Sequence, residues 1–130
     1  MQIARVQFVV EAVPTWRNWF VQVLGCQVVG DRHTDDTEIA IVVSGRAEFW
    51  LTAPRSDRSP AAAYLGTHPP GVADVTFAVE DVAATLDRAL HCGAKLLQPP
   101  NAAGTEARLL SPAGLQHTLP RRRYLAAPLS

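Results

Sequence analysis

The residue types that most often bind metals or act as nucleophiles are few in this chain and lie far apart. The 130 residues include four histidines and two cysteines: His33, His68, His91, His117, Cys26 and Cys92. No two of these six residues are two, three or four positions apart, and the cysteines fit neither a disulfide scaffold nor a zinc knuckle. The local sequence therefore gives no support to Ser-His-Asp or Cys-His catalysis. We interpret the histidines as structural or solvated.

A second set of polar side chains has regular spacing. Four short segments alternate polar and apolar residues, as half-buried strands do, so the polar side chains of each segment share one face. The members of this set are Arg5, Gln7, Glu48, Trp50, Asp74, Thr76, Gln116 and Thr118. Arginine binds carboxylates through paired hydrogen bonds, and a tryptophan ring stacks on aromatic ligands. These are the candidate ligand-binding residues of a cavity-facing surface.

An internal repeat places these segments. Residues 8–13 (FVVEAV) match residues 77–82 (FAVEDV) at an offset of 69, and Gly25 matches Gly93 at an offset of 68. Repeats of this kind indicate a duplicated structural unit. The repeat also pairs Arg5 with Asp74, and Trp50 with Thr118, as equivalent positions in the two copies.

Each copy shows the same order of predicted elements, a strand, a helix and three further strands. In the first copy the strands are residues 3–10, 26–30, 37–43 and 47–52, and the helix begins at Pro14 and ends before Gly25. In the second copy the strands are residues 72–79, 95–97, 106–110 and 115–119, and the helix runs from an Asp81 N-cap to Gly93. The helix aromatics Trp16, Trp19 and Phe20 are predicted core residues, of which one tryptophan could instead mark an interface.

The pattern predicts an α+β fold of two βαβββ modules in tandem, with mixed curved sheets and helices on the outer face. Module one covers residues 1–53 and module two residues 71–123, within a single domain of residues 1–130. Residues 54–70 are rich in Pro, Ser and Ala and are predicted to be a linker, with a short helical candidate at residues 61–65.

Composition limits the possible partners. Twelve basic and twelve acidic residues give a formal net charge of zero, which disfavours nucleic-acid binding. No apolar run reaches the roughly 20 residues that span a bilayer, and the first residues lack the pattern of a secretory leader. We therefore expect no membrane partner and a cytoplasmic location.

The duplicated βαβββ order resembles the vicinal oxygen chelate superfamily of glyoxalase I, extradiol dioxygenases and bleomycin-resistance proteins. Residues 71–82 (GVADVTFAVEDV) followed by Gly93-Ala94 resemble a signature of 4-hydroxyphenylpyruvate dioxygenase, and so do residues 15–20 (TWRNWF), 49–52 (FWLT), 68–70 (HPP) and 117–119 (HTL). The resemblance is to the N-terminal half of that enzyme. It implies a parent activity, the Fe(II)-dependent oxidation of 4-hydroxyphenylpyruvate in tyrosine catabolism, whose iron ligands lie in the other half.

The resemblance also locates the family's ligand positions, which are on the first and last strands of the modules. Here they hold Arg5, Trp50, Asp74 and Thr118. Arginine and tryptophan offer no lone pair to a metal, and Fe(II) in such enzymes takes two imidazoles and a carboxylate. We predict no metal site, no cofactor and no dioxygenase activity in this chain, with Fe(II) expected only in a complete catalytic relative.

Several functions remain open at this stage. The first is a scaffold that packs against a catalytic partner domain or a second copy of itself, the homodimer being implied by single-domain relatives. The alternative is a metal-free binding protein for a small aromatic or carboxylated ligand, such as an aromatic 2-oxo acid. A third is an enzyme with a Glu48–Asp74 acid/base pair. Arg5 and Asp74 are predicted either to form a salt bridge, with Glu48 competing for Arg5, or to leave Arg5 for a ligand carboxylate.

Overall fold

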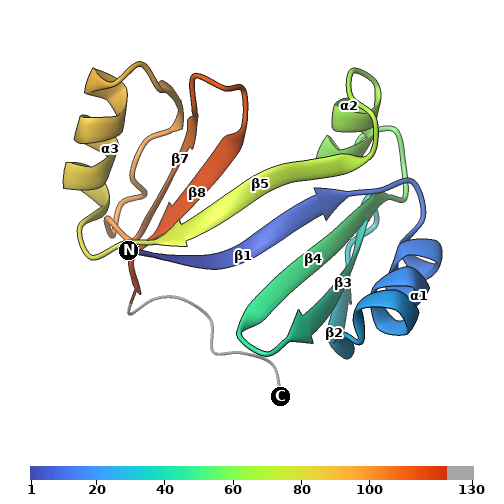
Figure 1. The fold of residues 1–130 in the computed structure, drawn as a ribbon. Helices are drawn as coiled ribbons and strands as arrows, with labels where there is room; N and C mark the ends of the chain where they lie inside the picture. Colours follow the sequence, from blue (N-terminus) through green and yellow to red (C-terminus); the bar gives the residue numbers. More distant parts are fainter. Residues whose placement is uncertain (123–130) are drawn as a thin grey trace. The chain divides into compact units, whose positions relative to one another are not determined.

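The computed structural model describes residues 1–122, which form strands and three helices in an α+β arrangement (Figure 1). These residues divide into two compact units. We call residues 5–73 the N-terminal unit, and residues 1–4 with 74–122 the C-terminal unit. The boundaries fall inside β1 (Gln2–Val9) and β5 (Gly71–Ala78), so both strands contribute residues to each unit. Arg123, the last residue of the predicted second module, lies outside the described residues.

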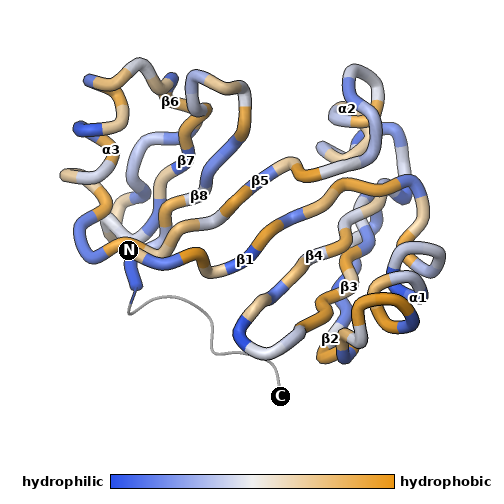
Figure 2. Tube along the Cα trace, viewed as in Figure 1, coloured by the Kyte–Doolittle hydropathy of each residue, from blue (hydrophilic) through white to orange (hydrophobic). Residues whose placement is uncertain are grey.

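The N-terminal unit contains a mixed sheet in the order β2-β3-β4-β1. Strands β2 (Gln27–His33), β3 (Thr37–Ser44) and β4 (Ala47–Pro54) pair antiparallel, and β1 pairs parallel to β4. Gln7 of β1 lies beside Trp50, and Phe8 lies beside Leu51. Alternate residues therefore point to opposite faces, and Figure 2 shows the corresponding alternation of hydrophilic and hydrophobic positions along β1.

Helix α1 (Val13–Leu24) covers one face of this sheet and packs on β3 and β4. Pro14 lies in its first turn, and Gly25 ends it in the left-handed conformation at φ 69°, which a side chain would disfavour. The buried core beneath α1 is apolar and consists of Val10, Val13, Phe20, Cys26, Ala40, Val42, Leu51 and Ala53. Burial raises the pKa of the Cys26 thiol, because the thiolate would lose its hydration.

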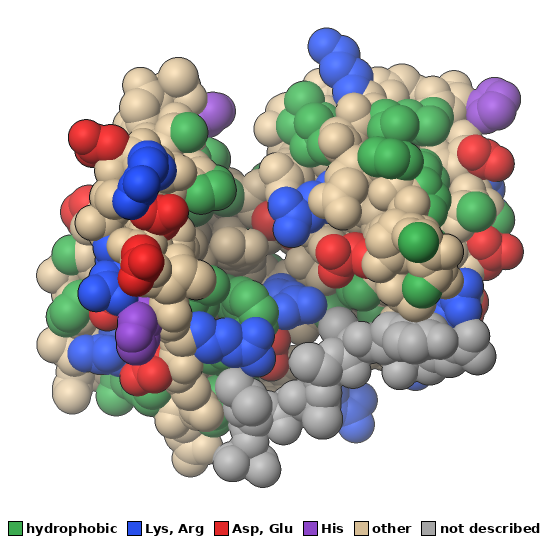
Figure 3. Space-filling model, turned by 180° about the vertical axis from the view of Figure 1, so that it is seen from behind, with side chains coloured by type: hydrophobic (Ala, Val, Ile, Leu, Met, Phe, Trp, Pro, Cys, Tyr) green, Lys and Arg blue, Asp and Glu red, His purple; other side chains and the backbone are tan. Residues whose placement is uncertain are grey.

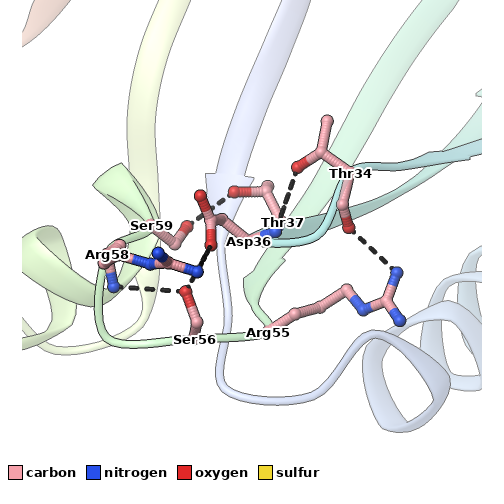
Figure 4. A network of polar contacts seen from close by, with 7 residues as sticks. All are labelled: Thr34, Asp36, Thr37, Arg55, Ser56, Arg58 and Ser59. Carbon is pink, nitrogen blue, oxygen red and sulfur yellow. Dashed lines mark hydrogen bonds and ion pairs between the residues drawn. The ribbon is translucent and has the colours of Figure 1, made fainter.

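The segment predicted to be a linker is fastened to the N-terminal unit. It contains α2 (Pro60–Leu65), whose N-cap Ser59 accepts from the Ala61 amide and lies 2.7 Å from the Thr37 hydroxyl. Beside it, Ser56 donates to Asp36 at 2.6 Å, and Arg58 is ion-paired with the same carboxylate at 3.4 Å (Figure 4). The short helix expected at residues 61–65 is confirmed, and the segment packs on the module rather than lying free beside it.

The C-terminal unit contains a second mixed sheet in the order β5-β8-β7-β6. Strands β6 (Lys95–Gln98), β7 (Glu106–Leu110) and β8 (Gln116–Pro120) pair antiparallel, and β8 pairs parallel to β5. Helix α3 (Val82–His91) begins at the predicted N-cap, Asp81, which accepts from the Ala84 amide. The buried core of the C-terminal unit consists of Val79, Val82, Leu86, Ala107, Leu109 and Leu119.

Each unit thus has the predicted βαβββ order, and the predicted fold class is confirmed. Most boundaries agree with their expectation to within two residues, and the largest difference is at the end of β2. The strand predicted to end at Gly30 continues to His33, because β3 extends far enough to pair with Arg32 through Ile39. Residues 31–36, which lie between two predicted strands and were therefore expected to form a polar loop, are strand as far as His33, and Arg32 lies on the sheet.

Candidate functional site

The polar side chains of the N-terminal unit gather on the sheet face opposite α1, around Trp50. The Arg5 guanidinium carbon lies 4.3 Å from the centre of the Trp50 ring, and the Arg32 guanidinium carbon lies 5.2 Å from it. Arg5 comes from β1 and Arg32 from β2, which lie on opposite sides of β4 in the strand order. A guanidinium over an indole face is attracted by the ring's negative quadrupole, by about 0.5–1 kcal/mol at exposed sites. We call Arg5, Arg32, Glu48 and Trp50 the arginine–tryptophan cluster.

Hydrogen bonds hold the indole in place. Its Nε1 donates to Glu48 Oε2 at 2.8 Å. Gln7 Nε2 donates to Thr52 Oγ1 at 3.1 Å on the same face. The predicted competition of Glu48 for Arg5 is therefore not what the structure shows, because the carboxylate binds the tryptophan instead.

The cluster leaves cationic donors available. In the described part of the N-terminal unit the ion pair within 4 Å is Arg58–Asp36, which does not involve Arg5 or Arg32. Arg32 is exposed and Arg5 is half-buried. With Glu48 as the counter-charge, the cluster carries a formal charge of +1 (two arginines, one glutamate), which suits a single carboxylate. Charges are otherwise interspersed on the face drawn in Figure 3, with no large patch of one sign among the described residues.

On the equivalent face of the C-terminal unit, the polar side chains form hydrogen bonds with one another. Asp74, only 3% exposed, accepts from Thr76 Oγ1 at 2.8 Å, Gln116 Nε2 at 3.1 Å and Thr118 Oγ1 at 2.8 Å. Backbone register brings Asp74 beside Gln116, and the parity predicted for these residues places all of them on one face. We call Asp74, Thr76, Gln116 and Thr118 the aspartate network. Its donors are neutral, and both carboxylate oxygens accept hydrogen bonds.

The structure thus brings the predicted residues together as two groups, one in each unit. Arg5 belongs to the N-terminal unit and Asp74 to the C-terminal unit, so the predicted ion pair between them stays a prediction. The same holds for the Glu48–Asp74 acid/base pair, and both of those carboxylates already accept hydrogen bonds within their own units. Arg32 was missed from the sequence because it was assigned to a loop. If the predicted strand at residues 26–30 had been extended by two residues, its alternation would have placed Arg32 on the same face as Gly30.

The donor set does not suit iron. In the N-terminal unit the two positions at which the resemblance places the family's ligands hold Arg5 and Trp50, which have no lone pair to offer. Among residues 1–122 no group of three or more His, Cys, Asp or Glu side chains is close enough to hold a metal ion. The side chains at these positions therefore cannot coordinate Fe(II) as the family's His and Glu ligands do.

Three of the four histidines have structural partners, as expected. His117 Nδ1 lies 2.9 Å from the Val75 carbonyl, and His91 Nδ1 lies 2.8 Å from the Asp87 carbonyl at the end of α3. The His68 ring stacks on Tyr64, with 4.5 Å between the ring centres. These contacts leave the histidines as parts of the local framework of each unit.

Comparison with known proteins gives the class. The family model for the glyoxalase/bleomycin resistance protein/dioxygenase superfamily matches residues 4–109. This chain belongs to that superfamily, and the resemblance found from the motifs is confirmed.

Solved structures refine the comparison. A mutant of 4-hydroxymandelate synthase from Streptomyces coelicolor is similar at 25% identity and a TM-score of 0.83; the match covers 98% of this chain and 38% of that one. A hypothetical protein, BH1468 from Bacillus halodurans, is similar at 18% identity and a TM-score of 0.78, with 98% of each chain covered. Methylmalonyl-CoA epimerase from Mycobacterium tuberculosis is similar at 21% identity and a TM-score of 0.70, covering 97% of this chain and 88% of that one. The last two likenesses establish the fold alone.

No helix within residues 1–122 has the length and hydropathy needed to span a membrane.

Proposed function

We propose that this chain is a 4-hydroxyphenylpyruvate dioxygenase-like protein of the non-catalytic type, which serves as a scaffold and has no iron site of its own. One observation carries the proposal: at the two ligand positions of the N-terminal unit, Arg5 lies 4.3 Å above the Trp50 ring. Neither the guanidinium nor the indole has a lone pair that could coordinate a metal. The permanent positive charge of Arg5 would also repel Fe(II).

Two further observations support this function. In the aspartate network the Asp74 oxygens accept three hydrogen bonds from neutral hydroxyl and amide groups, so the network lacks the two imidazoles that Fe(II) takes in such enzymes. This chain also spans 38% of the 4-hydroxymandelate synthase chain that it matches. A module of that size suits a role beside a catalytic domain or a second copy of itself, in the cytoplasm and without a cofactor of its own. A link to tyrosine catabolism is part of the same proposal.

Iron content tests the proposal directly. The purified protein is incubated anaerobically with Fe(II) and desalted, and the same sample is assayed for iron and for turnover of 4-hydroxyphenylpyruvate. Because the ligand positions of the N-terminal unit offer no lone pairs, we expect less than about 0.1 iron per chain and no turnover. Near-stoichiometric iron with turnover would overturn the proposal and make the four histidines the first residues to replace.

A second candidate function is favoured by Arg32. Its guanidinium joins that of Arg5 over Trp50, and neither has an ion-pair partner in the described part of the N-terminal unit. Two guanidinium groups beside an indole ring match the chemistry of a small aromatic carboxylate. The ring of such a ligand can stack, and its carboxylate can accept paired hydrogen bonds from a guanidinium. The protein would then be a metal-free binding module.

Calorimetry with the aromatic acid 4-hydroxyphenylacetate tests this candidate, with its uncharged amide, 4-hydroxyphenylacetamide, as the matched ligand. Binding of the acid should weaken at least about tenfold in Arg5→Met and in Arg32→Met, because each variant removes a charge-assisted donor. Arg46→Met is the control, because Arg46 is an exposed arginine in the β3–β4 turn of the same unit. Equal affinity for the acid and the amide, or equal losses in all three variants, would contradict a carboxylate site at the cluster.

A further inference from the structure

A cavity of about 420 Å³ lies within the N-terminal unit on the face that α1 covers. Its walls come from β1, α1, β4 and the start of β5, and it is lined by Phe8, Val10, Trp16, Trp19, Phe20, Leu24, Phe49, Pro70 and Gly71. Ligand pockets for small molecules typically have volumes of about 300–1,000 Å³ and mainly apolar linings. The cavity falls within that range, and we call it the α1 pocket.

The α1 pocket is distinct from the arginine–tryptophan cluster. Phe8 and Phe49 alternate with Gln7 and Trp50 along β1 and β4, so they point to the opposite face of the same sheet. A ligand in the pocket and a ligand at the cluster would be separated by the sheet. The two sites can therefore be tested one at a time.

Aromatic rings form most of the pocket wall and brace one another. Phe20 lies 5.5 Å from Phe8, 5.4 Å from Phe49 and 5.5 Å from Trp19, measured between ring centres. Trp16 lies 6.2 Å from Trp19. These are tilted and edge-to-face contacts, which hold the rings in defined orientations. A flat aromatic guest would meet both ring edges and ring faces.

The lining offers almost nothing to a charged group. None of its residues is ionisable, and the Trp16 indole N–H already donates to Glu11 Oε1 at 2.9 Å. The Trp19 indole N–H is the remaining side-chain donor of the lining, and no residue there carries a charge, so an ionised ligand would lose its hydration without gaining a charged partner, which is costly. The lining chemistry therefore selects an uncharged guest.

The mouth of the pocket is open to a small molecule. Trp19 is 43% exposed and Leu24 is 48% exposed, although both line the cavity. The exposed positions of α1 carry no acidic or basic residue, and the one charged side chain of this helix, Arg17, is half-buried. The rim that α1 contributes is therefore largely neutral, and an uncharged molecule can reach the cavity across it.

A second protein surface is a poorer occupant than a small molecule on grounds of area. A helix of 12 residues is about 18 Å long and about 10 Å wide, so it presents roughly 200 Å². A stable interface buries roughly 800 Å² on each partner. The α1 face alone would therefore supply about a quarter of what a dimer needs, while its cavity already has the volume of a small-molecule site.

We propose that the α1 pocket binds a small, uncharged aromatic compound of one to three rings, independently of any ligand at the arginine–tryptophan cluster. Burial of apolar area on both partners drives this binding. The braced rings of the wall add edge-to-face contacts to the guest.

The test uses N-phenyl-1-naphthylamine, an uncharged probe with an aniline ring and a naphthalene, whose fluorescence rises in apolar surroundings. Leu24→Arg places a charge at the mouth of the pocket, and Leu97→Arg is the matched control, because Leu97 is 49% exposed and lies on β6 of the other unit. We expect Leu24→Arg to weaken probe binding at least about tenfold and Leu97→Arg to change it less than about twofold. Because both leucines are about half exposed, both variants should keep the thermal midpoint of the parent chain.

Three further readouts make the outcome decisive. The sulfonated analogue of the probe, 1-anilinonaphthalene-8-sulfonate, should bind at the pocket at least about tenfold more weakly than the uncharged probe. The anion 4-hydroxyphenylpyruvate should not displace the uncharged probe. Equal binding of the uncharged probe by the two leucine variants would overturn the proposal. So would a Leu24→Arg variant that dissociates a dimer, seen by light scattering, while its probe binding stays intact, since the face would then serve self-association.

Discussion

The arginine–tryptophan cluster and the aspartate network occupy equivalent positions in the two copies of the repeat, yet they handle charge in opposite ways. In the C-terminal unit the buried carboxylate of Asp74 accepts hydrogen bonds from the side chains of Thr76, Gln116 and Thr118. In the N-terminal unit two guanidiniums share one ring, and the nearby carboxylate of Glu48 is committed to the indole N–H. The first arrangement is satisfied internally, and the second retains donors for a ligand.

With the cluster as the proposed binding site, the two copies of the repeat would divide stability and binding between them. A buried polar group is costly unless it is hydrogen-bonded, so the aspartate network contributes to stability only as a complete set. A guanidinium over an indole on a partly exposed face is worth little to stability. Substitutions in the two groups should therefore differ in size, and in which property they change.

The largest effect is expected from breaking the aspartate network. Asp74→Ala leaves three buried or half-buried donors without their acceptor, and we expect a loss of about 3 kcal/mol in the free energy of unfolding, measured by urea titration. Asp87→Ala on the exposed surface of α3 is the control and should change stability by less than about 0.5 kcal/mol. Similar small losses in both variants would mean that the network is not a stabilising unit.

An effect of intermediate size on the free energy of unfolding is expected from the predicted Arg5–Asp74 ion pair. A double-mutant cycle of Arg5→Met and Asp74→Ala should give a coupling energy of about 1 kcal/mol or more if the two side chains interact. Strictly additive losses would remove the ion pair from consideration and leave Arg5 to the indole and to a ligand. Either result sharpens the contrast between the two groups.

The smallest effect on stability is expected at Arg32. This side chain is exposed and lies 5.2 Å from the Trp50 ring centre, so Arg32→Met should cost at most about 0.5 kcal/mol in urea unfolding. Arg46→Met in the β3–β4 turn should cost nothing measurable. A loss at Arg32 as large as that at Asp74 would show that the cluster is structural, which would weaken the case for a binding site.

Much of the architecture could be predicted from local signals. Pro14 and Gly25 mark the ends of α1, Asp81 marks the start of α3, and the offsets of 69 and 68 residues aligned the two βαβββ copies. The shared parity of the cavity-facing residues also followed, because side chains in a strand alternate with a fixed period of two. Arg32 was the exception. Its segment is polar enough to suggest a loop, and only pairing with Ile39 of β3 makes it a strand.

By itself, then, the sequence determined which residues lie on which face of each strand, because the period of a strand is a local property. The ligand positions at Arg5 and Trp50 are implied by the family resemblance, and residue chemistry shows that these two side chains have no lone pair for a metal. Only the tertiary structure decided which side chains satisfy one another. That Glu48 turns to Trp50 rather than Arg5, that Asp74 is closed by three neutral donors, and that aromatic side chains leave a cavity beside α1 all depend on distances between strands and helices. Those distances arise from packing over the whole unit, which no short stretch of sequence encodes.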